Sequence, residues 1–291
     1  MVMNSRIGLL VDSAADVPSA VLAANDNIEV VPLDLMIDDV AYLDRVTITP
    51  DDFYQKQAVS DTQAKTASPS IGETQQRIEA LKQRGYDQII GITISSGLSV
   101  TNTVFNNAAT VTQDATVTII DTKNIGIGAG LQAAYAEKCI QAGFSYEVIV
   151  KAIQDSVLQS HVYFYIPTLK YLRAGGRIGR VAGLVGTMLS IKPVISCDEH
   201  GIYYPVAKAR TETKAVAKLV ALALDHCVPG TTFQVAVTHG ANLELLNQVV
   251  HQLQTKLPDQ PILTGDVSPA LGVHTGPGLV GIAVQVGDLP H

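Results

Sequence analysis

The clearest candidate for chemistry is the turn Ser95-Ser96-Gly97, which follows a predicted buried strand at residues 88–94. Such a turn presents hydroxyl groups and free backbone N–H groups, and Ser99 is placed to cap a helix behind it. The partial positive charge of a helix N-terminus favours an anion at this position. The turn therefore predicts a binding site for a small anion. The alternative is that these serines do no more than cap the helix.

A second hydroxyl-rich loop, KTASPS at residues 65–70, also leads into a predicted helix. Ser70 and Glu73 have the spacing of a capping box, and the helix is expected to end near Arg84. Two hydroxyl loops that lead into helix N-termini support an anion site better than one does. A carboxylate has about four lone-pair positions, so several hydroxyl groups can bind it together.

Two further segments carry candidate side chains. HTGPG at residues 274–278 predicts a tight loop, in which His274 can donate or accept a hydrogen bond near neutral pH. RAGGRIGR at residues 173–180 places Arg173, Arg177 and Arg180 around paired glycines. That pattern is suited to a phosphate group or a partner protein, and equally to a solvated loop.

The elements around these segments alternate between strand and helix, which predicts a parallel sheet with right-handed crossovers. Strands are expected at residues 7–11, 28–37, 88–94 and 117–120, and helices after Asp16-Pro18, after Thr49, and at residues 70–84, 125–141 and 146–159. Ligands bind beyond the carboxyl ends of such strands. This rule selects the loops at residues 12–13, 95–99 and 121–124.

From residue 161 the pattern changes to strand pairs mixed with helices, which predicts a second, α+β domain. The expected elements are strands at 161–166, 232–237 and 279–286, helical pieces at 170–185, a hairpin of 192–197 with 201–206, and helices at 211–226 and 243–256. We therefore expect an α/β protein with domains at residues 1–160 and 161–291.

The bulk properties exclude several classes of protein. The net charge of −7 argues against general nucleic-acid binding, although residues 170–218 hold nine basic and three acidic side chains. That basic segment suits an anionic partner, or is a set of solvated helix faces. No apolar run approaches the roughly 20 residues of a membrane span, and the opening does not resemble a signal peptide. Three scattered cysteines indicate reduced thiols in a cytoplasm.

Common enzyme motifs are missing. The sequence has no GxxxxGK[ST], so no P-loop is expected, and the glycine-rich run at residues 126–130 lacks the GxGxxG spacing. It also has no HExxH and no clustered His and Cys, so no metal site is expected. A serine hydrolase built from Ser96, His274 and either Asp12 or Asp121 stays an alternative, although no GxSxG is present.

Taken in order, the motifs resemble those of the DegV family of bacterial fatty-acid-binding proteins over nearly the whole chain. They are VDSAAD (11–16), TASPS (66–70), ITISSGLS (92–99), IDTKN (120–124), LKYLRAGGRIGR (169–180), SIKPVI (190–195), KART (208–211) and HTGPG (274–278). The resemblance implies a Rossmann-like N-terminal domain with a parallel sheet. It also implies an α+β C-terminal domain that covers a buried acyl chain.

The resemblance further implies that Thr66 and Ser96 hold the carboxylate of a long-chain fatty acid such as palmitate or oleate. His274 would belong to the same polar network, with Ser95 and Gly97 as neighbours. The family implies a carrier without catalysis, cofactor or membrane insertion. It would deliver the fatty acid to a fatty acid kinase that makes acyl phosphate for phospholipid synthesis.

Arg173, Arg177 and Arg180 would suit the face that docks on this kinase. The alternatives are an enzyme in its own right, either a small hydrolase or a phosphotransferase subunit, and a pure interaction protein. Two departures from the family pattern, Ala67 in place of a serine and Val100 in place of a glycine, concern acyl-chain preference more than the class of ligand.

Overall fold

The structure is a computed structural model, and it describes residues 6–184 and 191–290. Three parts of the sequence predictions lie partly outside this range. Residues 1–5 belong to the opening that was compared with a signal peptide. Val185 ends the helical segment expected at residues 170–185, and Ser190 begins the motif SIKPVI. The two domain limits at residues 1 and 291 lie outside it as well.

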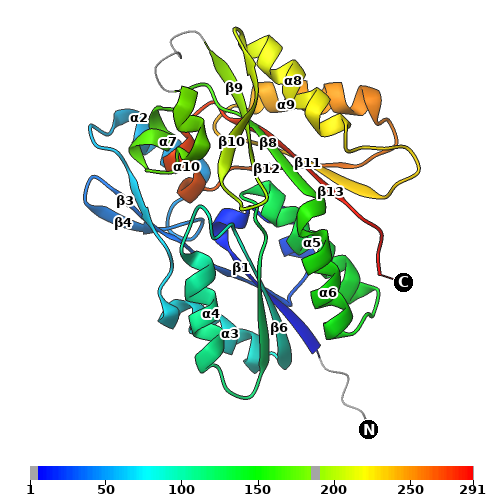
Figure 1. The fold of residues 1–291 in the computed structure, drawn as a ribbon. Coiled ribbons are helices and arrows are strands. Elements are labelled where there is room, and N and C mark those ends of the chain that lie inside the picture. The colour runs from blue at the N-terminus through cyan, green and yellow to red at the C-terminus, as the bar shows by residue number, and fades with distance from the viewer. Residues whose placement is uncertain (1–5, 185–190, 291) are drawn as a thin grey trace.

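The N-terminal part contains a parallel four-stranded sheet, as the alternation of strands and helices predicts (Figure 1). Strand β1 pairs in parallel with both β2 and β6, and β7 follows β6. Strand β1 is buried along nearly its whole length because helices pack on both faces of the sheet. The strands are β1 (Arg6–Asp12), β2 (Ile28–Val31), β6 (Tyr86–Thr93) and β7 (Thr116–Asp121).

The strand region predicted at residues 28–37 consists of two strands that belong to different sheets. Pro32 separates them, because it has no N–H to donate to a strand ladder. The second strand lies in a small antiparallel sheet with the order β4-β3-β5. Its strands are β3 (Asp34–Ile37), β4 (Val40–Leu43) and β5 (Lys65–Ala67). The prediction that Thr66 lies in a loop is therefore wrong, since this residue lies on β5 opposite Leu35.

Two of the N-terminal helices begin at the cap residue that the sequence predicts. The Thr49 side chain accepts a hydrogen bond from Asp52 N at the start of α2. Ser70 and Glu73 form both bonds of the predicted capping box on α3. The helices are α1 (Ser19–Ala24), α2 (Pro50–Val59), α3 (Ile71–Gln83), α4 (Thr101–Val111), α5 (Ile127–Gln141) and α6 (Tyr146–Ser156), with short 3₁₀ turns η1 (Ser13–Ala15) and η2 (Val157–Gln159).

Ser99 is not the cap of helix α4, contrary to the prediction. The helix begins at Thr101, and the cap position belongs to Val100, which makes no side-chain hydrogen bond there. The turn after β6 runs one residue further than expected. The Ser99 hydroxyl accepts a hydrogen bond from Thr101 N at 3.3 Å, and it lies 2.8 Å from the Thr101 hydroxyl.

The C-terminal part contains a six-stranded mixed sheet with the order β10-β9-β8-β13-β11-β12. The predicted hairpin is confirmed as the antiparallel pair of β9 and β10. The edge strand β12, which is parallel to β11, was missed, because it is short and only partly buried. The strands are β8 (Ser160–Tyr165), β9 (Lys192–Cys197), β10 (Tyr203–Ala209), β11 (Phe233–His239), β12 (Ile262–Asp266) and β13 (Val280–Val286).

Helices α8 and α9 cover one face of this sheet (Figure 1), and apolar side chains fill the space between them and the strands. Helix α10 was missed, although Ser268 caps it and Pro269 opens it. His274 therefore lies in the last turn of a helix and not in the predicted loop, which begins at Gly276. The remaining elements are α7 (Lys170–Ala174), η3 (Gly179–Leu184), α8 (Glu212–Leu224), α9 (Leu243–Lys256) and α10 (Pro269–Thr275).

The two parts share one hydrophobic core. It combines residues of the N-terminal loops and helix α5 with residues of the C-terminal sheet and helix α10. Helix α5 contacts β1 of the first sheet and both β8 and β13 of the second. A domain boundary between residues 160 and 161 stays a prediction. In residues 6–184 and 191–290, no helix has the length and apolar character needed to cross a membrane.

Candidate functional site

Loops from three strands of the parallel sheet meet at one edge of that sheet, as the strand rule predicts. The backbone N–H of Ile94 donates to Asp12 Oδ2 at 2.8 Å, which joins the ends of β6 and β1. The backbone N–H of Ser95 donates to the carbonyl of Asn124 at 2.7 Å, which joins β6 to the loop after β7. The predicted anion-binding turn is thus held rigidly by its neighbours.

The structure brings Thr66 and His274 together. Thr66 Oγ1 lies 2.8 Å from His274 Nε2, within hydrogen-bond distance. Burial, reinforced by the charge of Arg177, lowers the pKa of His274 to about 4, so the ring is neutral at pH 7. The tautomer with the proton on Nε2 leaves the Thr66 hydroxyl proton free for an anion.

A small cavity of about 40 Å³ lies beside this pair. Its polar lining residues are Thr66, Ser99, Arg177, Tyr203 and His274. The apolar part of its lining includes Leu33, Ile94, Leu98, Ile125 and Leu271. Hydroxyl groups, an imidazole and a guanidinium therefore face a pocket whose other walls are apolar. This arrangement suits a ligand with an anionic head and an apolar body.

The model of the DegV family of uncharacterised proteins matches residues 6–286 of the chain. The chain belongs to the DegV family. A DegV domain-containing protein of Clostridium acetobutylicum is 34% identical over 284 residues, which are 96% of this chain and 98% of the relative.

Two solved structures of the DegV family resemble the chain over almost their whole length. DegV from Bacillus subtilis, described as a fatty acid binding protein, is 25% identical with a TM-score of 0.89, and the match covers 97% of this chain and 100% of that one. A DegV family protein from Thermus thermophilus, described for fatty acid binding, is 27% identical with a TM-score of 0.86 and the same coverage. The expected fold, a Rossmann-like N-terminal part and an α+β C-terminal part, is confirmed.

In this DegV protein Ser95 and Gly97 contact the β9–β10 hairpin. Ser95 is fully buried, and its hydroxyl donates to the carbonyl of Gly201 at 2.9 Å while it accepts from Gly97 N at 3.0 Å. A Cβ atom on residue 97 would lie 2.8 Å from the carbonyl oxygen of His200. The turn therefore needs glycine at this position, and both residues hold the hairpin against the N-terminal sheet.

Ser96 is exposed and is not among the residues that line the cavity. Its hydroxyl accepts a hydrogen bond from Lys123 Nζ at 3.2 Å, and its backbone N–H donates to Asp121 at 3.2 Å. Burial acts to raise the pKa of Asp121, but hydrogen bonds from Lys123 and Ser96 have the larger combined effect. The pKa of this carboxyl is therefore below its ordinary value. Sequence reasoning did not single out Lys123, although the motif IDTKN contains it.

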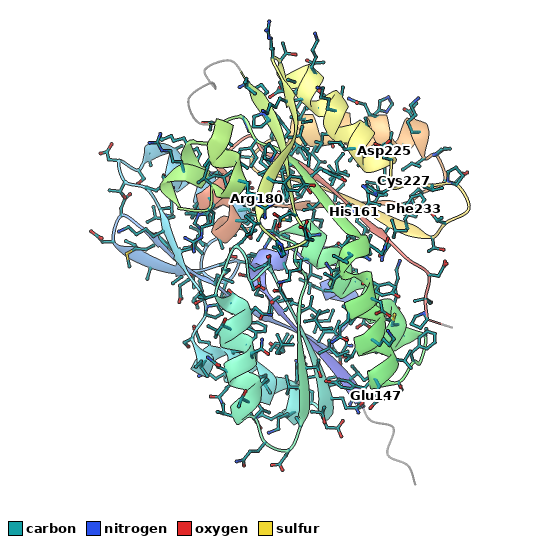
Figure 2. The ribbon with its side chains drawn as sticks, viewed as in Figure 1. Glu147, His161, Arg180, Asp225, Cys227 and Phe233 are labelled. Carbon is teal, nitrogen blue, oxygen red and sulfur yellow. The ribbon has the colours of Figure 1, made fainter. Side chains whose placement is uncertain are left out.

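The three arginines of the GGRIGR segment have different surroundings. Arg177 lies at the cavity wall, where its Nε donates to the carbonyl of Leu98 at 3.3 Å. Arg180 pairs with Asp198 at 3.1 Å and lies beside strand β10, as Figure 2 shows. Arg173 is exposed. The predicted docking role of these residues stays a prediction, and Arg177 also belongs to the candidate binding site.

The DegV-family motif VDSAAD contains Asp12 and Asp16, which form a buried acidic group with Asp44. Sequence reasoning did not identify this group. Burial raises the pKa of Asp12 and of Asp44 to about 7, and that of Asp16 to about 6. Arg45 donates to Asp16 at 2.9 Å, and the backbone N–H of Ser268 donates to the same carboxylate at 3.0 Å. Because Ser268 caps α10, this group fixes the start of the helix that carries His274.

The catalytic triad considered for a hydrolase is not joined by hydrogen bonds in the part of the chain that the structure describes. His274 Nε2 contacts Thr66, and His274 Nδ1 has no partner. The Ser96 hydroxyl contacts Lys123. A nucleophilic serine needs a base within hydrogen-bond reach, so this geometry does not favour the hydrolase. Among the same residues, no group of three or more His, Cys, Asp or Glu side chains could hold a metal ion.

Proposed function

We propose that the protein binds a long-chain fatty acid, such as palmitate or oleate, with its carboxylate at Thr66 and Arg177. The observation that carries this proposal is that Thr66, Ser99 and Arg177 converge on one cavity with apolar walls. An arginine can hold a carboxylate through two parallel hydrogen bonds. The descriptions of the Bacillus subtilis and Thermus thermophilus proteins as fatty acid binding support the same class of ligand.

In this proposal the acyl chain supplies most of the affinity and the polar residues supply orientation. Burial of a methylene group is favourable by about 0.8 kcal/mol before the costs of binding. A cavity of about 40 Å³ has room for the carboxylate and the first carbons. The rest of the acyl chain therefore has to displace side chains of the shared core. That core is apolar and lies between the two sheets, where an extended chain loses its contact with water.

Ser96, which the family resemblance assigns to the carboxylate, enters the proposal as a residue at the outer edge of the site. Its hydroxyl accepts a hydrogen bond from Lys123 and can still donate its own proton to a carboxylate. Lys123 would then bring a positive charge towards the same anion. Ser95 is different, because its hydroxyl already has two partners within the protein.

We also propose that the protein is a carrier in the cytoplasm, without catalysis of its own. It would present the carboxylate to a fatty acid kinase, which would convert it to an acyl phosphate for phospholipid synthesis. The exposure of Arg177, together with the partial exposure of Thr66 and Ser99, supports this step, because the carboxylate would face solvent. The exposed Arg173 and Arg180 would contribute to the docking face.

Extraction of the purified protein with organic solvent, followed by mass spectrometry, tests the binding proposal. We expect close to one fatty acid per chain. A protein that yields none, and that also fails to bind added palmitate or oleate, would contradict it. The carrier proposal is tested by adding a fatty acid kinase with ATP to the loaded protein and measuring acyl phosphate. The proposal that the protein does not catalyse a reaction is tested with model esters. Hydrolysis by the wild type that is lost in both Ser96→Ala and His274→Ala would contradict it.

A further inference from the structure

Tyr203 lines the same cavity as Thr66 and His274, although no motif includes it. It is the first residue of β10 and is only 2% exposed. Its backbone is held on two sides. Tyr203 pairs with Cys197 across the hairpin, and a Cβ atom on Gly179 would lie 2.7 Å from the Tyr203 carbonyl oxygen. Movement at this position therefore has to come from the side chain.

No hydrogen bond to the Tyr203 hydroxyl occurs within residues 6–184 and 191–290. Burial, with smaller contributions from Cys197 and Asp16, raises the pKa of this phenol well above its ordinary value, so the group stays neutral. Buried tyrosines usually give their hydroxyl a partner. Tyr165 and Tyr163, on strand β8 of the same sheet, both do so. Packing alone therefore holds the Tyr203 ring in place.

The exposure of the lining residues shows which end of the cavity Tyr203 occupies. Arg177 is exposed and Thr66 is partly exposed, so these residues mark the side of the cavity that faces solvent. Tyr203 is buried and belongs to the core between the two sheets, with Phe164 and Ile195. Tyr203 thus belongs to the buried side of the cavity lining, next to the apolar interior.

We propose that Tyr203 is a specificity-determining residue, whose ring occupies space that a long acyl chain needs and so sets the chain length that the protein accepts. The inference rests on the proposed fatty-acid binding. A chain that extends inward from Thr66 and Arg177 meets the ring before it reaches the rest of the core. The ring can turn aside without breaking a hydrogen bond, and the space that it leaves is fixed by the hairpin.

The neighbouring Tyr204 offers a matched control. Successive side chains of a strand point to opposite faces, so Tyr204 lies on the other side of β10. It is partly exposed and is not among the residues that line the cavity. A change at residue 204 alters the same strand and the same residue type without altering the cavity.

The experiment compares wild type with Tyr203→Ala, Tyr203→Val, Tyr203→Phe and Tyr204→Ala. Binding of saturated fatty acids from decanoate to eicosanoate is measured for each by competition with a fluorescent fatty acid. We expect the preferred chain length to rise by about three carbons in Tyr203→Ala and by fewer in Tyr203→Val, in proportion to the volume removed. Tyr203→Phe and Tyr204→Ala should keep the wild-type profile, because neither changes the space in the cavity.

Two results would overturn the inference. One is an unchanged chain-length profile in both Tyr203→Ala and Tyr203→Val. The other is a shift in Tyr203→Phe as large as that in Tyr203→Ala, which would assign the effect to the hydroxyl. Thermal unfolding identifies any variant that does not fold, and Tyr203→Val keeps the test decisive if Tyr203→Ala is too unstable. If wild type binds no fatty acid at all, the proposed function fails, which is a separate outcome.

Discussion

Thr66 Oγ1 and His274 Nε2 lie 2.8 Å apart although 208 positions separate the two residues in the chain. Thr66 comes from the small antiparallel sheet and His274 from helix α10 of the C-terminal part. The contact therefore exists only when the two parts of the molecule are packed together. It places a hydroxyl and a neutral imidazole at the cavity where we propose that a carboxylate binds.

Substitution of Thr66 should weaken fatty-acid binding more than it changes stability. A hydrogen bond to a charged group contributes about 1.5–3 kcal/mol, so Thr66→Ala should lower the affinity for palmitate by roughly 10- to 100-fold. Thr66→Ser keeps the hydroxyl and should recover most of this loss. Isothermal titration calorimetry measures both. Thr110→Ala, which removes an exposed hydroxyl on α4, is the control, and a loss of similar size there would count against the site.

The two serines of the turn after β6 should respond differently to alanine. Ser95→Ala removes a buried hydroxyl that contacts Gly201 and Gly97, and should lower the free energy of unfolding by about 1–3 kcal/mol. Ser96→Ala should leave the free energy of unfolding unchanged and weaken carboxylate binding. Urea unfolding and fatty-acid titration of both variants separate the two effects. Unchanged affinity in Ser96→Ala would remove this residue from the proposed site.

Gly97→Ala should destabilise the protein by about 1–3 kcal/mol, because the new Cβ atom would press on the backbone carbonyl of His200. A backbone atom cannot move aside as a flexible side chain does, so the hairpin itself has to shift. Gly183→Ala is the matched control, since a Cβ atom there meets nothing within 4 Å. Urea unfolding compares the two variants. Equal stability of both would show that the hairpin does not press on this turn in solution.

The buried acidic group should make stability depend on pH. Burial raises the pKa of Asp44 from 3.8 to about 7, so between these values the folded protein keeps a proton that the unfolded chain has released. The stabilising contribution is therefore complete below the unfolded pKa and is lost as pH rises through about 7. We expect the free energy of unfolding to fall by about 1–2 kcal/mol between about pH 5.5 and pH 8.

Asp44→Asn tests this prediction, because an amide stays neutral and can still accept the hydrogen bond that Ser13 donates to residue 44. The fall in stability between acid and alkaline pH should be smaller in this variant than in wild type, when both are measured by urea unfolding. The exposed Asp51→Asn should keep the wild-type dependence. If the free energy of unfolding fell more steeply with pH in Asp44→Asn than in wild type, protonation of Asp44 would not be the source of the stabilisation at low pH.

Much of the framework follows from local patterns in the sequence. The buried run at β1, the capping box of Ser70 with Glu73 and the hairpin after Lys192 each depend on neighbouring residues, and each is confirmed. The rule for the carboxyl ends of parallel strands also selected the loops that meet at Asp12, Ser95 and Asn124. These features need no contact beyond a strand, a turn or a sheet edge.

Tertiary packing decided which of the candidate residues share a cavity. Ser95 and Ser96 are adjacent in sequence, but their hydroxyl groups have different surroundings. The β9–β10 hairpin buries the Ser95 hydroxyl, whereas Lys123 donates a hydrogen bond to the exposed Ser96 hydroxyl. The sequence grouped Arg177 with Arg173 and Arg180, whereas the fold places it beside Thr66 and His274. Nothing local marks Tyr203 or Asp44 at all. Their roles arise because packing brings distant segments within a few ångströms, where burial changes both the available space and the pKa of a side chain.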